Sequence, residues 1–230
     1  MNIGGIQRLS LLDYPDQTCC TVFTVGCNYR CPFCHNAAII EHRPAEKAIS
    51  EEDVIMFLKK RRGLLDGVCI SGGEPLLHDD LENFIREIKA LGFLVKLDTN
   101  GSFPGKLKQL IKMGLVDYVA MDIKNSPDLY GRTIGINNYS LESVKESVDL
   151  LLSRRVNYEF RTTVVCQFHT SNEILSMARW LKGAERYYLQ NFVDSGDVLE
   201  PGLSGYSRAA MQVFKELVQP LIPAVALRGI

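Results

Sequence analysis

The sequence of 230 residues lacks an excess of either charge, a long apolar run and a cysteine pattern suited to disulfides. Lysine and arginine number 26, aspartate and glutamate 27, and the resulting net charge of −1 argues against a dedicated nucleic-acid-binding protein. No apolar run reaches the roughly 18 residues of a membrane-spanning helix. The first ten residues lack the basic start and apolar core of a secretory signal. We therefore expect a cytoplasmic protein whose partners include neither a membrane nor a nucleic acid.

The seven cysteines are an odd number, which makes a poor disulfide framework in a chain without a signal. Three of them, Cys27, Cys31 and Cys34, lie within eight residues of one another and mark the region where we expect the chemistry. The other four have apolar neighbours and are expected to be small core residues: Cys19, Cys20, Cys69 and Cys166.

Apolar, β-branched segments alternate with segments of helical period along most of the chain. The expected strands are 18–25, 66–71, 93–98, 116–121, 158–165 and 186–192. The expected helices lie at about 51–62, 79–90, 105–113, 141–152, 171–181 and 206–221, with Ser50 and Ser140 as N-caps.

Strands that alternate with helices form βαβ units and a parallel sheet. Six such strands are two short of a closed (β/α)8 barrel. We therefore expect an α/β fold, a partial and open (β/α)6 TIM-like barrel, with a doubly wound open sheet as the alternative. One domain should span residues 1–230, with a core at about 11–192 and a C-terminal helical extension at about 204–230. In either fold the carboxyl ends of the strands form the functional face.

The three cysteines follow the first expected strand and so belong to that face. Thiolates bind both zinc and iron–sulfur clusters, so the spacing alone leaves the metal open. One interpretation is a structural zinc site with His35 or His42 as the fourth ligand, although such sites favour paired C-x2-C motifs. The other is a [4Fe-4S] cluster with three protein ligands and one open iron, because catalytic metal sites keep an open position.

Three further motifs follow expected strands. In Ser71-Gly72-Gly73-Glu74-Pro75 the glycines let backbone approach a ligand closely, although Gly-Gly is often only a turn. Asp98, in Asp98-Thr99-Asn100-Gly101, can accept hydrogen bonds from an ammonium or a ribose hydroxyl, or can form an Asx-turn. Asp122 and Lys124 lie on one face of an extended segment, where the simpler interpretation is a surface ion pair.

Arg161 and Thr163 share one face of the fifth expected strand. Side chains on that face could point into an open barrel. Contact with solvent or ordinary packing explains these two residues about as well, so both interpretations stay open.

The segment Cys27-Asn28-Tyr29-Arg30-Cys31-Pro32-Phe33-Cys34 resembles the C-x3-C-x2-C signature of the radical S-adenosylmethionine (SAM) superfamily, including the aromatic residue before the third cysteine. With His35-Asn36 added, it resembles the glycyl-radical-enzyme activating enzymes. Leu12-Asp13-Tyr14-Pro15 and Phe23-Thr24-Val25-Gly26 are similar to segments of the anaerobic ribonucleoside-triphosphate reductase activating proteins. The resemblance runs from about residue 11 to residue 192.

The resemblance implies one [4Fe-4S] cluster on Cys27, Cys31 and Cys34, with SAM bound at the open iron. An electron from the cluster would cleave SAM to a 5′-deoxyadenosyl radical, which abstracts hydrogen from a glycine of a partner glycyl radical enzyme, with no further catalytic side chain. A flavodoxin or a ferredoxin-type protein would donate the electron. The implied SAM-binding residues are Phe33 beside the adenine, Gly72, Gly73 and Glu74 at the amino group, Asp98, Asp122, and Lys124 at the carboxylate.

Two positions differ from the pyruvate formate-lyase activating enzymes. Val193 stands where those enzymes carry a SAM-contacting histidine, and Tyr14-Pro15-Asp16 replaces a Gly-Pro-Gly. Both differences count against a pyruvate formate-lyase-like partner, which stays as one alternative. A second is a stand-alone radical SAM enzyme for a small molecule, such as a deazaguanine-type synthase, and a third is a non-catalytic metal or electron-transfer protein. Further cysteine sets are missing, so a single cluster is expected.

Overall fold

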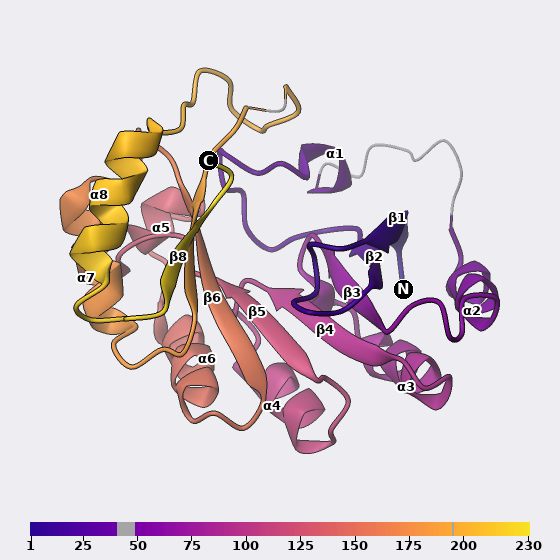
Figure 1. The fold of residues 1–230 in the computed structure, drawn as a ribbon. Coiled ribbons are helices and arrows are strands. Elements are labelled where there is room, and N and C mark those ends of the chain that lie inside the picture. Colours follow the sequence, from indigo (N-terminus) through magenta and orange to yellow (C-terminus); the bar gives the residue numbers. More distant parts are fainter. Residues whose placement is uncertain (41–48, 195) are drawn as a thin grey trace. The chain divides into compact units, whose positions relative to one another are not determined.

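The computed structural model describes residues 1–40, 49–194 and 196–230, in which strands and helices alternate along most of the chain (Figure 1). The strands are β1 (Ile3–Ser10), β2 (Cys19–Thr24), β3 (Gly67–Gly72), β4 (Leu94–Thr99), β5 (Tyr118–Asp122), β6 (Asn157–Val164), β7 (Tyr187–Asn191) and β8 (Val225–Arg228). The helices are α1 (Ala37–Ile40), α2 (Glu51–Lys59), α3 (Leu81–Ala90), α4 (Pro104–Lys112), α5 (Tyr130–Thr133), α6 (Glu142–Leu152), α7 (Ser171–Trp180) and α8 (Arg208–Val218). Short 3-10 turns at Pro75–Leu77 and Pro127–Leu129 follow β3 and β5.

The strands form one mostly parallel sheet whose hydrogen-bonded order follows the chain from β1 to β8. β1 pairs antiparallel with β2, whereas the pairs β2–β3, β3–β4, β6–β7 and β7–β8 are parallel. β1 and β8 are the two ends of the order, so the sheet is open. The expected α/β class and the partial, open barrel are confirmed, and the six expected strands correspond to β2 through β7.

β1 and β8 lie outside the six expected strands, and α1 lies outside the expected helices. β1 contains Gly4 and Gly5 and then three consecutive exposed residues, so it shows neither an apolar run nor a clean alternation. β8 has only four residues, and the C-terminal extension therefore holds a strand as well as α8. The irregular burial of β1 and the short length of β8 leave little periodic signal in the sequence.

Helix starts depend on capping. The side chain of Ser50 accepts a hydrogen bond from the backbone N–H of Asp53, whose carboxylate accepts one from the Ser50 N–H, so the expected N-cap of α2 is confirmed. Ser140 is not the cap of α6, because that helix starts one residue later, after Leu141, without a side-chain cap. α7 begins with a second capping box, formed by Thr170 and Glu173.

The chain divides into two compact units. Unit 1 comprises Met1–Asn28, Ala38–Ala120 and Arg155–Asn157. Its core consists of apolar residues of β2, β3 and β4 together with one face of α3, and Phe84, Ile85 and Ile88 of that helix are fully buried. The amphipathic spacing of α3 thus forms the side that covers the strands, as its sequence predicts.

Unit 2 comprises Tyr29–Ala37, Met121–Arg154 and Tyr158–Ile230. Alternate residues of β6 face α7, where Thr162 Oγ1 lies 3.8 Å from Met177 Sδ, and the Tyr187 hydroxyl of β7 points to the same place. The alternation puts Glu159, Arg161 and Thr163 on the opposite side of β6. One side of these strands is therefore apolar and covered by helix, and the other is polar.

Among the described residues, no helix combines the length and the apolar character that crossing a membrane requires.

Candidate active site

The loop between β2 and α1 carries Cys27, Cys31 and Cys34, and the boundary between the two units falls within it, after Asn28. All seven cysteines of the chain are free thiols, and Cys19, Cys20 and Cys69 are fully buried as expected, whereas Cys166 is half-buried. Within the described ranges no three His, Cys, Asp or Glu side chains are arranged to hold a single metal ion. A [4Fe-4S] cluster instead takes one cysteine per iron atom. His42 lies outside the described residues.

In unit 1, the Gly72-Gly73 turn lies directly against the backbone that leads into Cys27. The Gly73 N–H donates to Thr24 O at 2.9 Å, and the Glu74 N–H donates to Gly26 O at 2.9 Å. A Cβ atom on Gly73 would lie 1.8 Å from Gly26 O and 3.3 Å from Cys27 N. Only glycine permits this approach, so the glycine motif has a definite structural role beside the cysteine loop.

The Glu74 side chain is fully buried, and it connects the end of β3 to the end of β4. Its Oε1 accepts hydrogen bonds from Leu76 N at 3.1 Å and from Thr99 Oγ1 at 2.8 Å, and its Oε2 accepts one from Asn100 N at 2.7 Å. Both carboxylate oxygens are therefore used inside unit 1. Any contact of this motif with a ligand would come from its backbone.

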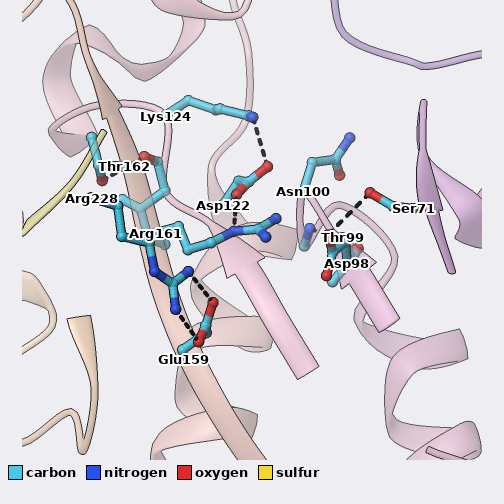
Figure 2. A network of polar contacts seen from close by, with 12 residues as sticks. Ser71, Asp98, Thr99, Asn100, Asp122, Lys124, Glu159, Arg161, Thr162 and Arg228 are labelled. Atoms are coloured by element: carbon cyan, nitrogen blue, oxygen red, sulfur yellow. Dashed lines mark hydrogen bonds and ion pairs between the residues drawn. The ribbon is translucent and has the colours of Figure 1, made fainter. Parts of the chain in front are cut away.

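Asp98, at the end of β4, is held by two other side chains. Ser71 Oγ donates to Asp98 Oδ2 at 3.0 Å (Figure 2), and Lys96 Nζ pairs with Asp98 Oδ1. The Lys96 side chain is 1% exposed and its Nζ also lies 3.8 Å from Cys69 Sγ. Asp98, next to the last residue of β4, is thus a carboxylate that is paired with the buried ammonium group of Lys96.

Asn100 connects the same strand end to the start of the cysteine loop. Its Nδ2 lies 2.9 Å from Asn28 Oδ1 and 3.9 Å from Cys27 Sγ. The Asn100 Oδ1 accepts from the backbone and the hydroxyl of Ser102, so the Asx-turn in this motif is formed by Asn100 and not by Asp98. An amide N–H beside Cys27 sulfur is the kind of contact that tunes metal-bound thiolates.

In unit 2, two cations share one carboxylate at the end of β5 (Figure 2). Lys124 Nζ donates to Asp122 Oδ2 at 3.0 Å, and Arg161 Nε donates to Asp122 Oδ1 at 2.9 Å. These three side chains carry a net charge of 2 − 1 = +1. Arg161 therefore belongs to the candidate site. The sequence alone did not decide between this role and ordinary packing.

Lys124 interacts electrostatically with two of the motif cysteines. Burial lowers the pKa of the Lys124 ammonium, but Asp122 and Cys31 raise it more, so that the pKa ends above its usual value. Burial raises the pKa of the Cys34 thiol, and the charge of Lys124 acts in the opposite direction. Unit 2 thus brings Lys124 together with Cys31 and Cys34.

Phe33 is buried rather than presented on the surface, at 3% exposure. Its ring lies 5.7 Å from that of Phe168 and 6.3 Å from that of His169. Burial lowers the pKa of His169, whose Nδ1 accepts from Val165 N and whose Nε2 lies 2.9 Å from Lys124 O. His169 therefore holds the backbone of Lys124 through a contact with its carbonyl oxygen.

Lys96, His169, Glu159 and Arg228 belong to none of the motifs that the sequence singles out. Lys96 left one usable signal, a lysine between apolar residues in a strand expected to be buried. Glu159 binds Arg228 through two hydrogen bonds across β7, a pairing that depends on β8. The exposed Val193 has its carbonyl oxygen 2.9 Å from His35 Nε2.

Comparison with known proteins identifies the family of this chain. Residues 21–181 match the radical SAM superfamily. Two proteins of Methanocaldococcus jannaschii, provisionally named glycyl-radical enzyme activating enzymes, are similar to this chain. One is 35% identical over 83% of this chain and 79% of its own length, and the other is 25% identical over 80% and 70%.

Solved structures agree on the fold. Streptococcus suis SuiB bound to the precursor peptide SuiA superposes with a TM-score of 0.72 at 16% identity, over 91% of this chain and 48% of that one. A domain of a pyruvate-formate lyase-activating enzyme from Bacteroides vulgatus gives a TM-score of 0.57 at 16% identity, over 71% of this chain and 99% of that one. The family match covers all three cysteines and the three strand-end motifs. The chain belongs to the radical SAM superfamily.

Proposed function

We propose that this protein is a glycyl-radical-enzyme activating enzyme that cleaves SAM reductively at a [4Fe-4S] cluster held by Cys27, Cys31 and Cys34. The observation that carries the proposal is the ion pair of Lys124 with Asp122 at the end of β5, in the same compact unit as Cys31 and Cys34. A cation fixed beside cluster cysteines is suited to hold the carboxylate of SAM near the iron.

The donor set fits the cluster. Three free thiols within eight residues match the ligand type of iron–sulfur centres, and the Asn100 amide beside Cys27 Sγ adds a sulfur contact. When bound, the cluster supplies the electron that cleaves SAM, and the nucleoside radical released from SAM takes a hydrogen atom from the substrate. The protein binds and orients SAM and the substrate, and it shields the radical from side reactions.

The protein's own residues divide that task by charge. The net +1 of Lys124, Arg161 and Asp122 complements the single negative charge of a carboxylate. Asp98 is a carboxylate at the end of the neighbouring strand in the sequence and is suited to an ammonium or ribose hydroxyl. Gly72 and Gly73 offer backbone groups for the amino group of SAM. Phe33 packs on Phe168 and is 3% exposed, so only the small exposed part of its ring would lie beside adenine.

The proposed substrate is a polypeptide, and the partner to test first is an anaerobic ribonucleotide reductase. The similarity to proteins provisionally named glycyl-radical enzyme activating enzymes over most of the chain supports a protein substrate. The segments Leu12-Asp13-Tyr14-Pro15 and Phe23-Thr24-Val25-Gly26 favour the reductase as partner. A flavodoxin or ferredoxin-type donor completes the proposal.

The test is anaerobic incubation of the reconstituted protein, SAM and a reductant with an anaerobic ribonucleotide reductase. We expect about four irons per chain, a glycyl-radical doublet by electron paramagnetic resonance, and 5′-deoxyadenosine in proportion to that radical. Cys31→Ala should abolish the doublet, and Cys166→Ala, which removes a cysteine outside the motif, should leave it. A silent reductase together with 5′-deoxyadenosine formation driven by a small molecule would instead establish the stand-alone enzyme.

A further inference from the structure

One side of β6, β7 and β8 in unit 2 carries polar side chains where a barrel interior is normally filled with branched apolar ones. In the parallel register Arg161 pairs with Tyr188, Thr163 with Gln190, and Gln190 in turn with Arg228. Because alternate residues share a face, Thr163, Tyr188 and Gln190 lie on the side opposite to α7. We call these three residues the polar face.

The three side chains of the polar face have unused hydrogen-bonding capacity. Within the part of the chain that the structure describes, neither the Thr163 hydroxyl, the Tyr188 hydroxyl nor the Gln190 carboxamide has a hydrogen-bond partner in the protein. All three residues are partly exposed. Since unpaired polar groups are costly when they are shut away from partners, this face must meet water or a polar ligand.

The ion pair between Arg228 and Glu159 lies beside the polar face and fixes the ring of Tyr188. Arg228 donates from Nη1 and Nη2 to the two oxygens of Glu159, at 2.8 and 3.1 Å (Figure 2). The guanidinium carbon of Arg228 also lies 3.4 Å from the centre of the Tyr188 ring. Glu159 is 1% exposed, so its charge is matched by Arg228 rather than by solvent. The face therefore has fixed geometry and offers neutral hydrogen-bonding groups.

We propose that Thr163, Tyr188 and Gln190 form a subsite for the main chain of the substrate polypeptide on either side of the target glycine. The proposal rests on the proposed function. Glycine has no side chain to recognise, so selective binding at the reacting residue must use its peptide groups. A carboxamide presents one C=O and one N–H pair, which complement the N–H and C=O of a peptide. Neutral partners suit a neutral main chain.

The experiment follows transfer of deuterium from a blocked pentapeptide, acetyl-Ala-Ala-Gly-Ala-Ala-amide, dideuterated at the glycine Cα. Dithionite supplies one electron, SAM yields methionine and a 5′-deoxyadenosyl radical, and one C–D bond of the glycine breaks as one C–D bond of 5′-deoxyadenosine forms. The unpaired electron then rests on the glycine Cα. The measured quantity is the peptide concentration that gives half-maximal deuterium transfer, with the SAM dissociation constant as second measurement.

We expect Gln190→Ala to raise that half-maximal concentration about ten-fold, since two neutral hydrogen bonds are lost. Thr163→Val should raise it less. Gln212→Ala removes an exposed glutamine of α8 and should change neither measurement. Iron content and SAM affinity report whether each variant is folded.

Three results would overturn the subsite. An unchanged half-maximal concentration in Gln190→Ala shows that the main chain binds elsewhere, and an equal rise in the SAM dissociation constant assigns Gln190 to SAM. Absence of deuterium transfer in the unaltered protein, with a small molecule driving 5′-deoxyadenosine release, refutes the proposed function and this subsite with it. The unaltered protein thus separates the two failures.

Discussion

At the scale of single residues, the candidate site is built from carboxylates that already have cationic partners. Asp98 pairs with the buried Lys96, and Asp122 pairs with Lys124 and Arg161. A buried or half-buried pair gains little stability by itself, because removing two charges from water costs about as much as their attraction returns. Its value lies in fixing side chains in place, which is what a binding site for a zwitterion needs.

The sequence can predict that Asp98, Asp122 and Lys124 stand at strand ends, because each follows an apolar run. It cannot predict their partners. Arg161 reaches Asp122 from another strand, and the pairing depends on register, which period-two alternation leaves undetermined between strands. The burial of Glu74 is unpredictable for the same reason, because the groups that donate to its carboxylate come from two segments of the chain.

We predict that Lys124→Ala weakens SAM binding while iron loading stays intact. A charge-assisted hydrogen bond to a carboxylate contributes roughly 1.5–3 kcal/mol, which is about ten-fold to more than a hundred-fold in affinity. Anaerobic calorimetry measures the effect. Lys145→Ala, which removes an exposed lysine of α6, is the control and should bind SAM normally. Normal binding in Lys124→Ala would remove this lysine from the site.

At the scale of elements, the decisive contact is between the turn after β3 and the segment after β2. Both follow strands that the sequence predicts well, because buried parallel strands are continuous apolar runs. The closeness of the two turns is visible only in the structure, where Gly73 touches Gly26. Helix starts show the same limit: Ser50 caps its helix, whereas the equally plausible Ser140 does not, because α6 begins one residue later.

We predict that Gly73→Ala lowers stability and iron loading together. The new methyl group would overlap Gly26 O, so the two backbones must separate, and overpacking of this kind costs about 1–3 kcal/mol. Anaerobic denaturant unfolding and iron analysis measure the two effects. The control is Gly105→Ala in the first turn of α4, where a Cβ meets nothing within 4 Å. Equal behaviour of both variants would mean that the close approach has no importance.

At the scale of the whole molecule, the open sheet with its strand-end motifs follows from the alternation of strands and helices, and six of its strands are predicted by the sequence. The two terminal strands are not, because β1 shows no regular alternation and β8 has only four residues. Stability of the folded chain also depends on a buried group that the motifs do not include. His169 is fully buried, and its Nε2 lies 2.9 Å from Lys124 O.

We predict that acid destabilises the fold partly through His169. Burial lowers the pKa of His169 in the folded state, so the unfolded chain binds the proton more readily. The stabilisation is complete above the unfolded pKa of about 6.5 and is lost as the pH falls below it. The free energy of unfolding, measured anaerobically from pH 7.5 to 5, should fall less steeply in His169→Gln. His78→Gln is the control, and the full slope should persist in it.

The irregular pairing of β1 has a consequence for behaviour in concentrated solution. Its register with β2 shifts between Ile3 and Gly5 and again between Gln7 and Ser10, and Arg8 is exposed at this end of the sheet. Bulges and charges on a terminal strand disturb the row of backbone groups that another chain would need as a template. β8, at the opposite end, offers only four residues. Both margins of the sheet are therefore poor starting points for strand-by-strand aggregation.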